Sequence, residues 1–261
     1  MQKKHENYKE LVWMLAKTDF KLRYQGSFLG YVWAILQPLL LFLVLNLVFS
    51  GVFGTGARGG GVPFYSLQLL VALMLFTFFS EGTNAGLNSL KSKAQLVTKI
   101  YVPRWSIIIA ATIQSLMVFV ANILVIIAFF AWYHFIPSVS AIIVFLFFIF
   151  MLYVVILSFS LIAGPLLLYF RDLKMIWQVA LRVMFYLTPI LYPLQLLPEW
   201  THKIALLNPL AFVIHFAKES MFAGHYPDGW QYVMFAAVVS SFFVFSIWAY
   251  RKIIVNVAEK V

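Results

Sequence analysis

Long runs of apolar residues, separated by short polar segments, dominate the sequence. A bilayer core about 30 Å thick is crossed by about 20 apolar residues in a helix. No period-2 alternation typical of barrel strands is present, so each crossing segment is predicted to be a helix with internally bonded backbone. The segments long enough to cross lie at about 29–53, 64–87, 105–133, 139–169, 175–197 and 230–250. The chain is therefore expected to be an all-α membrane protein with six transmembrane helices.

The amino-terminal segment, residues 1–28, has a different pattern. Tyr8, Leu11, Val12, Leu15, Asp19 and Leu22 recur at helical spacing, and all but Asp19 have apolar bodies. Lysine and arginine residues lie between them. This pattern predicts an amphipathic helix in the membrane interface, which could serve as a simple anchor or as a docking site for a partner.

A second amphipathic segment connects the second and third spans, at residues 88–104. Leu90, Ala94, Val97 and Tyr101 line one face, and Pro103 ends the pattern. Such a short helix could lie on lipid headgroups or pack against a cytoplasmic protein. Periodicity alone does not decide between these two arrangements.

The region 189–229 is apolar but interrupted. Half of the ten prolines of the chain fall within it, and two of them, Pro189 and Pro193, break the fifth predicted span. The stretches 198–208 and 209–222 are too short to span a bilayer, so they are predicted to form re-entrant helices that dip into the outer leaflet. The glycine-rich segment 51–61 lacks the Lys-Ser/Thr of a phosphate-binding loop and is expected to be a plain loop.

The composition supports a membrane protein. Hydrophobic residues make up 63% of the chain and charged residues 11%, against about 45–50% and about 25% in soluble domains. The absence of cysteine excludes a disulfide scaffold, a thiolate zinc site and a cysteine nucleophile.

The net charge of +10 is explained by topology. Fifteen of the nineteen Lys and Arg residues lie in the terminal segments and in the connections after the second and fourth spans. The positive-inside rule then places both termini in the cytoplasm of a multi-pass protein of the cytoplasmic membrane. No nucleic-acid partner is expected, because these charges are dispersed over four segments rather than gathered in one patch.

Two charges lie within the predicted spans, and intramembrane charges usually have a function. Glu81 and Arg182 lie at similar depths, about 9 Å and about 10 Å from the cytoplasmic ends of their helices. They are candidates for a charge pair. Alternatively, Arg182 could meet the phosphate of a lipid-linked substrate.

Polar and aromatic side chains at helical spacing suggest a substrate channel. Gln178, Arg182 and Tyr186 repeat at i, i+4 and i+8, and aromatic rings offer flat surfaces on which sugars can slide. An interfacial aromatic belt or ordinary helix packing is the alternative. The candidate channel residues are Trp33, Phe42, Asn46, Phe49, Phe76, Phe79, Gln178, Arg182, Phe185, Tyr186 and Tyr192.

Catalytic and nucleotide-binding motifs are missing. The five histidines show no metal-ligand spacing, no Ser lies in a G-x-S-x-G motif, and no P-loop is present. We therefore expect no cofactor or metal in this chain and no enzyme activity. Energy for transport would come from a separate subunit, although a passive channel has the same motif content.

Several strings, taken in order, resemble permeases of ABC-2 type polysaccharide exporters. They are RYQGSFLGYVW at 23–33, QPLL at 37–40, FFSE at 78–81, LVTKIYVPR at 96–104, YFRDL at 169–173, TPILYP at 188–193 and Asn208-Pro209. The resemblance implies one ABC-2 transmembrane domain over 1–261 with the type V exporter-like permease fold. It also implies a homodimer enclosing a channel, and two separate ATPase subunits that bind ATP and Mg.

By the same resemblance, the substrate is an undecaprenyl-linked polysaccharide such as O-antigen, capsule or teichoic acid. Residues 88–104 would be the coupling helix, with the turn after the fourth span as a second ATPase contact. The implied coupling residues are Lys91, Lys93, Leu96, Lys99, Tyr101, Arg104, Arg171 and Asp172. The alternatives are an ABC-2 drug or lipid exporter and a membrane enzyme acting on lipid-linked glycans.

Overall fold

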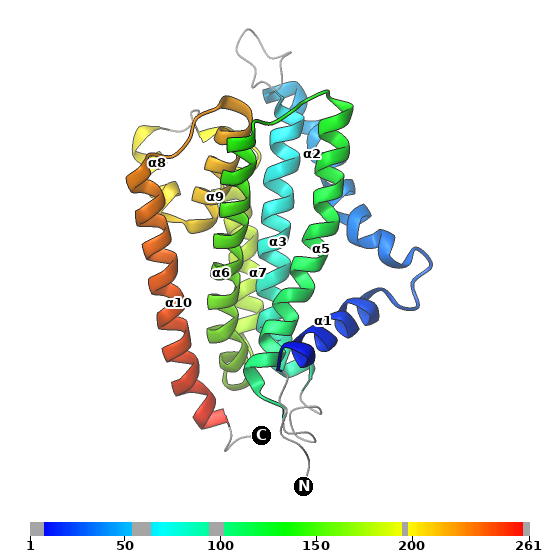
Figure 1. Cartoon of the computed structure of the whole chain (residues 1–261), viewed down its shortest axis with the longest axis vertical. Coiled ribbons are helices and arrows are strands. Elements are labelled where there is room, and N and C mark those ends of the chain that lie inside the picture. Colours follow the sequence, from blue (N-terminus) through cyan, green and yellow to red (C-terminus); the bar gives the residue numbers. More distant parts are fainter. Residues whose placement is uncertain (1–7, 54–63, 94–101, 195–197, 258–261) are drawn as a thin grey trace.

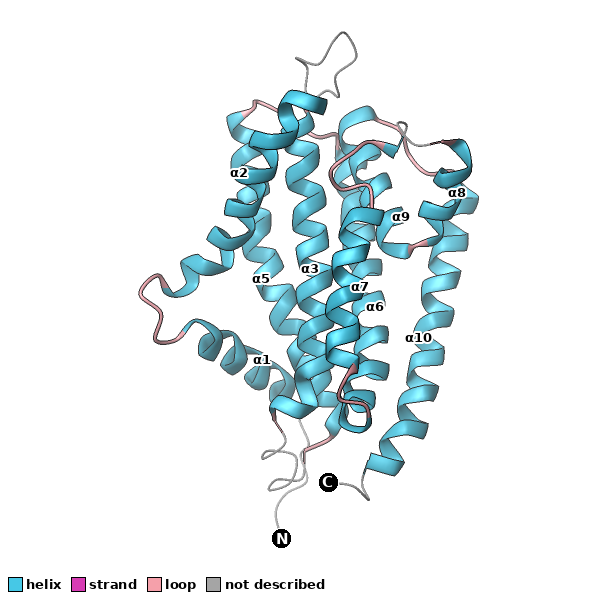
Figure 2. Ribbon diagram, turned by 180° about the vertical axis from the view of Figure 1, so that it is seen from behind, coloured by secondary structure: helices cyan, strands magenta, loops and turns pink. Residues whose placement is uncertain are grey.

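The computed structural model describes residues 8–53, 64–93, 102–194 and 198–257, and these form helices joined by short connections (Figures 1 and 2). Within these ranges there is no strand, which confirms the all-α prediction. The elements are α1 (Tyr8–Tyr24), the 3-10 turn η1 (Gly30–Val32), α2 (Trp33–Phe53), α3 (Tyr65–Ser92), α5 (Arg104–Trp132), α6 (Val139–Tyr169), α7 (Leu173–Leu187), α8 (Glu199–Leu207), α9 (Pro209–Lys218), the π-helical turn η3 (Glu219–Ala223) and α10 (Gly229–Val257).

Of the described helices, five are long and apolar enough to cross a bilayer. They are η1 with α2, α3, α5, α6 and α10, and they match the first, second, third, fourth and sixth predicted spans closely. The chain is thus a multi-pass membrane protein. Helix α1, ahead of them, coincides with the predicted amphipathic amino-terminal helix.

The fifth predicted span differs from expectation. Helix α7 has 15 residues, which at 1.5 Å each cover about 22 Å and fall short of the bilayer core. It ends because Thr188 precedes a proline and adopts extended backbone, with φ −83° and ψ 141°. Beyond it the chain runs irregularly through residue 194 before the short helices α8 and α9.

Helix α3 is the centre of the bundle, between α5 and α6 (Figure 1). Two thirds of its most apolar window is buried inside the protein, a larger share than in the other long helices. Small residues allow it to approach α6 closely, since a side chain at Gly86 would overlap Ser160 and one at Gly82 would press on Ile156. Helix α10 packs on the outer side of α6, and α1 packs on α5.

The two ends of the bundle carry different elements. Helix α1 and the last turns of α10 lie at one end, and α8 and α9 lie at the opposite end (Figure 1). At the second end, the Asn208 side chain caps α9 by accepting a bond from the Leu210 amide at 3.0 Å. Lys218, at the end of α9, is buried and donates to the Pro189 carbonyl at 2.5 Å, which ties α9 to the break after α7.

Candidate functional site

A cavity of about 580 Å³ opens between α3 and α7, with one contribution from α2. It is lined by Leu41, Phe76, Ser80, Asn84, Gln178, Leu181, Arg182, Phe185 and Tyr186. We call this cavity the α3–α7 groove. It combines aromatic rings with hydroxyl, amide and guanidinium groups, which suits a ligand that has both flat apolar faces and hydrogen-bonding groups.

The groove arises from two matching helical stripes. On α3, Phe76, Ser80 and Asn84 follow at i, i+4 and i+8, and α7 carries its own stripe of three at the same spacing. Residues four apart lie above one another on a helix, so each stripe forms a continuous face. The α7 stripe is the one predicted from the sequence.

Helix α7 is fixed beside the groove by contacts of Trp177. Trp177 stacks on Phe159 with ring centroids 4.0 Å apart, and its indole nitrogen donates to the Thr83 hydroxyl at 3.2 Å. Within the groove, Phe76 and Phe185 meet edge to face at 5.2 Å. These contacts orient α7 so that its polar stripe stays exposed.

Five of the predicted channel residues meet in this groove: Phe76, Gln178, Arg182, Phe185 and Tyr186. Arg182 is exposed and makes no ion pair with any described residue. Its guanidinium is therefore available to an anion or to hydroxyl groups in the groove. Ser80 and Asn84 were missed in the sequence, although their i, i+4 spacing on an apolar helix was a usable signal.

The predicted charge pair between Glu81 and Arg182 is wrong. Glu81 instead accepts two hydrogen bonds from Arg23 of α1, from Nη2 to Oε1 at 2.8 Å and from Nη1 to Oε2 at 3.1 Å. One residue turns a helix by about 100°, so Glu81 points away from the groove that Ser80 lines. Similar depth along two helices was not enough to bring the charges of Glu81 and Arg182 together, because they lie on different faces of the bundle.

Arg23 is held in its charged form by this contact. Partial burial disfavours the guanidinium charge, but the Glu81 carboxylate attracts it and accepts its hydrogen bonds. The net result is a pKa of Arg23 above its ordinary value. A second pair, Lys93 Nζ to Asp19 Oδ2 at 2.6 Å, joins α1 to the end of α3. We call these two pairs the α1–α3 clamp.

The remaining predicted channel residues lie outside the groove. Phe42 is buried against Phe129, and Phe79 is buried beside Trp177. Trp33 begins α2, and Asn46 and Phe49 are half-buried further along it. Tyr192 donates to the Tyr186 carbonyl at 2.9 Å and lines a separate cavity of about 400 Å³ between the end of α7 and α8.

The predicted coupling residues are only partly within the described chain. Lys91 is exposed at the end of α3, and Arg104 begins α5 and donates to the Ile254 carbonyl of α10 at 3.2 Å. Arg171 and Asp172 are exposed in the turn between α6 and α7. Leu96, Lys99 and Tyr101 lie outside the described residues. In the part of the chain that the structure describes, no cluster of His, Asp or Glu could hold a metal ion.

Comparison with known proteins decides the family. Residues 10–222 match the model of the ABC-2 type transporter family. The chain belongs to this family. An O-antigen export system permease protein, RfbA, from Klebsiella pneumoniae is 31% identical over 215 residues, covering 78% of this chain and 77% of that protein. RfbA from Myxococcus xanthus is 26% identical over 88% of this chain and 87% of its own length.

A more distant relative is the polysialic acid transport protein KpsM from Escherichia coli, 22% identical over 81% of each chain. This ABC-2 type transporter chain is accordingly a transporter subunit and not an enzyme. The groove and the clamp both lie within the matched residues.

Proposed function

We propose that this chain is the transmembrane subunit of an ATP-driven exporter that moves an undecaprenyl-linked polysaccharide across the cytoplasmic membrane. The observation that carries the proposal is the α3–α7 groove, in which three aromatic rings lie beside the donors of Ser80, Asn84 and Arg182. Sugar rings present apolar faces and hydroxyl groups together, and the linking pyrophosphate is an anion that Arg182 can bind. The relatives that export O-antigen and transport polysialic acid support a glycan substrate.

The active form in this proposal is a homodimer. Helix α2 buries only 17% of its most apolar window, and Leu181 is the one buried residue among the described side chains of α7. The exposed faces of these helices flank the groove. A second copy placed against them would turn two open grooves into one enclosed channel, with α2 and α7 along its walls.

Energy in this proposal comes from two copies of a separate ATPase subunit, which bind ATP and Mg. The ATPase would contact the end of the bundle that carries Lys91, Arg104, Arg171 and Asp172. The excess of basic residues in the same connections supports placing this end, and both termini, in the cytoplasm.

The proposal is tested by export in a strain that lacks its own permease and is complemented with this chain and a partner ATPase subunit. Because the chain contains no cysteine, Gln178→Cys can report on the groove without background. We expect polysaccharide on the cell surface, and its loss when Gln178→Cys is labelled with a bulky maleimide. A labelled Lys17→Cys, on the exposed side of α1, is the matched control.

A lipid or drug exporter would give a different result. In reconstituted complex, lipid-linked glycan should stimulate ATP hydrolysis more than the same polyprenyl pyrophosphate without sugar. Equal stimulation by both would contradict the polysaccharide assignment, and an ATPase that never co-purifies would contradict the exporter assignment.

A further inference from the structure

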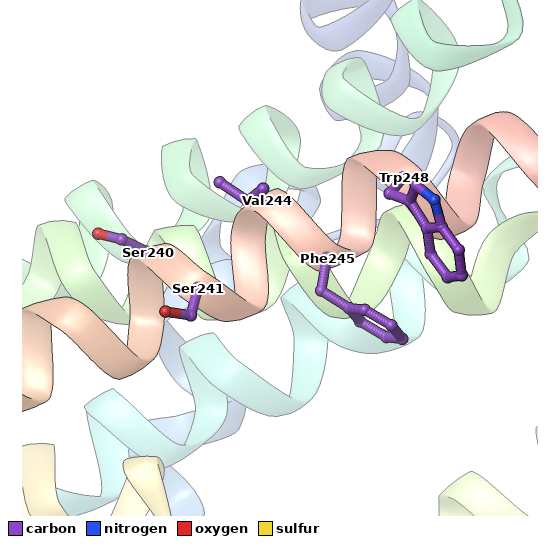
Figure 3. A pocket seen from close by; sticks show the side chains of 5 residues that line it. All are labelled: Ser240, Ser241, Val244, Phe245 and Trp248. Carbon is purple, nitrogen blue, oxygen red and sulfur yellow. The ribbon is translucent and has the colours of Figure 1, made fainter.

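A second concave surface lies on α10 and shares no lining residue with the α3–α7 groove. A cavity of about 650 Å³ follows one face of this helix and is lined by Ser240, Ser241, Val244, Phe245 and Trp248 (Figure 3). These side chains follow one another along α10, and the rings of Phe245 and Trp248 extend to the same side of the helix. Both rings are about half exposed, so the surface is open toward the membrane.

A positive charge lies at one end of this surface. The ammonium of Lys252 lies over the Trp248 ring, 4.1 Å from its centroid. Such cation–π contact holds the lysine in place without neutralising its charge. Arg251 is exposed beside it, and neither residue forms an ion pair within the described ranges.

We propose that this face of α10 binds an anionic phospholipid, with its phosphate at Lys252 and Arg251 and an acyl chain along Val244 and Phe245. The dimensions fit: Ser240 to Lys252 is about 18 Å along the helix, close to the depth of one leaflet of a core about 30 Å thick. Basic sites at the membrane-facing base of a helix commonly select anionic headgroups. The charge and the apolar surface are thus spaced as in one lipid molecule.

Two hydrogen bonds attach the base of α10 to the bundle. Arg104 of α5 donates to the Ile254 carbonyl at 3.2 Å, and the Tyr169 hydroxyl of α6 donates to the Ile253 carbonyl at 3.3 Å. These contacts come from the side that faces the bundle. The opposite side, with Trp248 and Lys252, is left to the lipid.

Native mass spectrometry of the full chain in detergent tests the site, with dioleoyl phosphatidylglycerol and dioleoyl phosphatidylcholine added in equal amounts. We expect preferential phosphatidylglycerol adducts. Lys252→Gln should weaken the preference about fivefold, as loss of one basic contact to an anionic lipid surface does. Trp248→Leu should weaken it as well, because the lysine loses its support. Lys17→Gln, an exposed lysine of α1, is the matched control and should change nothing.

The ratio of the two adducts is measured within one spectrum, so partial unfolding of a variant does not imitate the effect. Equal binding of both lipids, or an unchanged preference in Lys252→Gln, would overturn the proposal. The rival occupant, a second copy of the chain, is tested with Ser240→Cys, the single cysteine of that variant. Disulfide-linked dimers in membranes would assign this face to the second copy and reject the lipid.

Discussion

Arg23 and Glu81, 58 residues apart in sequence, form a two-point ion pair that ties the amino-terminal helix to the central helix of the bundle. With Asp19 and Lys93 it gives α1 two attachment points on α3. The predicted coupling segment 88–104 begins within the last turns of α3, which ends at Ser92. A displacement at that end of α3 would therefore be transmitted to α1 directly, through paired charges rather than through lipid.

Arg23→Gln is expected to lower stability and to reduce export. The substitution leaves the Glu81 carboxylate without its cation, at a cost of about 1 kcal/mol, because the arginine side chain is about one-third exposed. The midpoint of thermal unfolding in detergent should fall by a few degrees. Lys21→Gln, on the exposed side of the same helix, is the control.

The pairing itself is tested by exchange of the two charges. Arg23→Glu combined with Glu81→Arg should recover most of the thermal stability lost in either single variant. If Arg182→Glu, and not Arg23→Glu, restored the thermal stability lost in Glu81→Arg, the partner of Glu81 would be Arg182, as the sequence predicted.

Gly86 is expected to tolerate no side chain. A methyl group there would overlap the side chain of Ser160 across the α3–α6 contact, and overpacking of this kind typically costs about 1–3 kcal/mol. Gly86→Ala should lower the thermal midpoint, and Ser160→Gly in the same chain should restore part of it. Gly51→Ala in α2, where a methyl group meets nothing within 4 Å, should be neutral or stabilising. Equal loss in both alanine variants would point to helix propensity and not to packing.

Sequence patterns predicted the long helices well because apolar runs of 20 or more residues leave the chain few other arrangements in lipid. They also predicted the polar stripe of α7, since i, i+4, i+8 spacing is enough to define one face of a helix. Partners were harder to predict. The Glu81–Arg182 pair failed because depth along a helix says nothing about rotation around it, and the true partner, Arg23, lies on a helix outside the spans.

The fifth span was overestimated for a related reason. Hydropathy continues through residues 188–194, but Pro189 removes a backbone donor and its predecessor cannot stay helical. The apolar character there serves packing against α3 and α9, where Ile190 and Leu191 are buried in the main core. The hydrophobic pattern therefore predicted correctly that these residues are buried, but it predicted too long a helix.

Lys218 gives stability a predictable pH dependence. Burial lowers the pKa of Lys218 to about 8, below its ordinary 10.5, although the adjacent Glu219 opposes the shift. Between these values the unfolded chain retains a proton that the folded chain has lost, so stability should rise with pH from about 8 to about 10.5. The neighbouring His215 does not titrate in this window, because burial lowers its pKa to about 4.

The measurement is the thermal midpoint of wild type and Lys218→Met between pH 8 and pH 10. The wild type should gain stability relative to the variant as the pH rises. Lys174→Met, an exposed lysine at the start of α7, should follow the wild type. Parallel curves for wild type and Lys218→Met would show that the buried lysine does not titrate in this range.

Arg182→Gln is expected to reduce export strongly without destabilising the chain. The side chain is exposed in the α3–α7 groove and has no ion-pair partner among the described residues, so its loss should leave the thermal midpoint within about 1 °C, as for most surface substitutions. A charge-assisted contact to substrate contributes about 1.5–3 kcal/mol, which corresponds to a tenfold or greater loss in the rate of surface polysaccharide appearance. Arg182→Lys keeps the charge but loses the planar two-donor geometry, and it should retain intermediate activity.

Val183→Ala, one residue further on the exposed side of α7 and outside the groove lining, controls for simple changes on this helix. Full export by Arg182→Gln would remove the arginine from the substrate path and leave the aromatic and amide groups of the groove to account for transport.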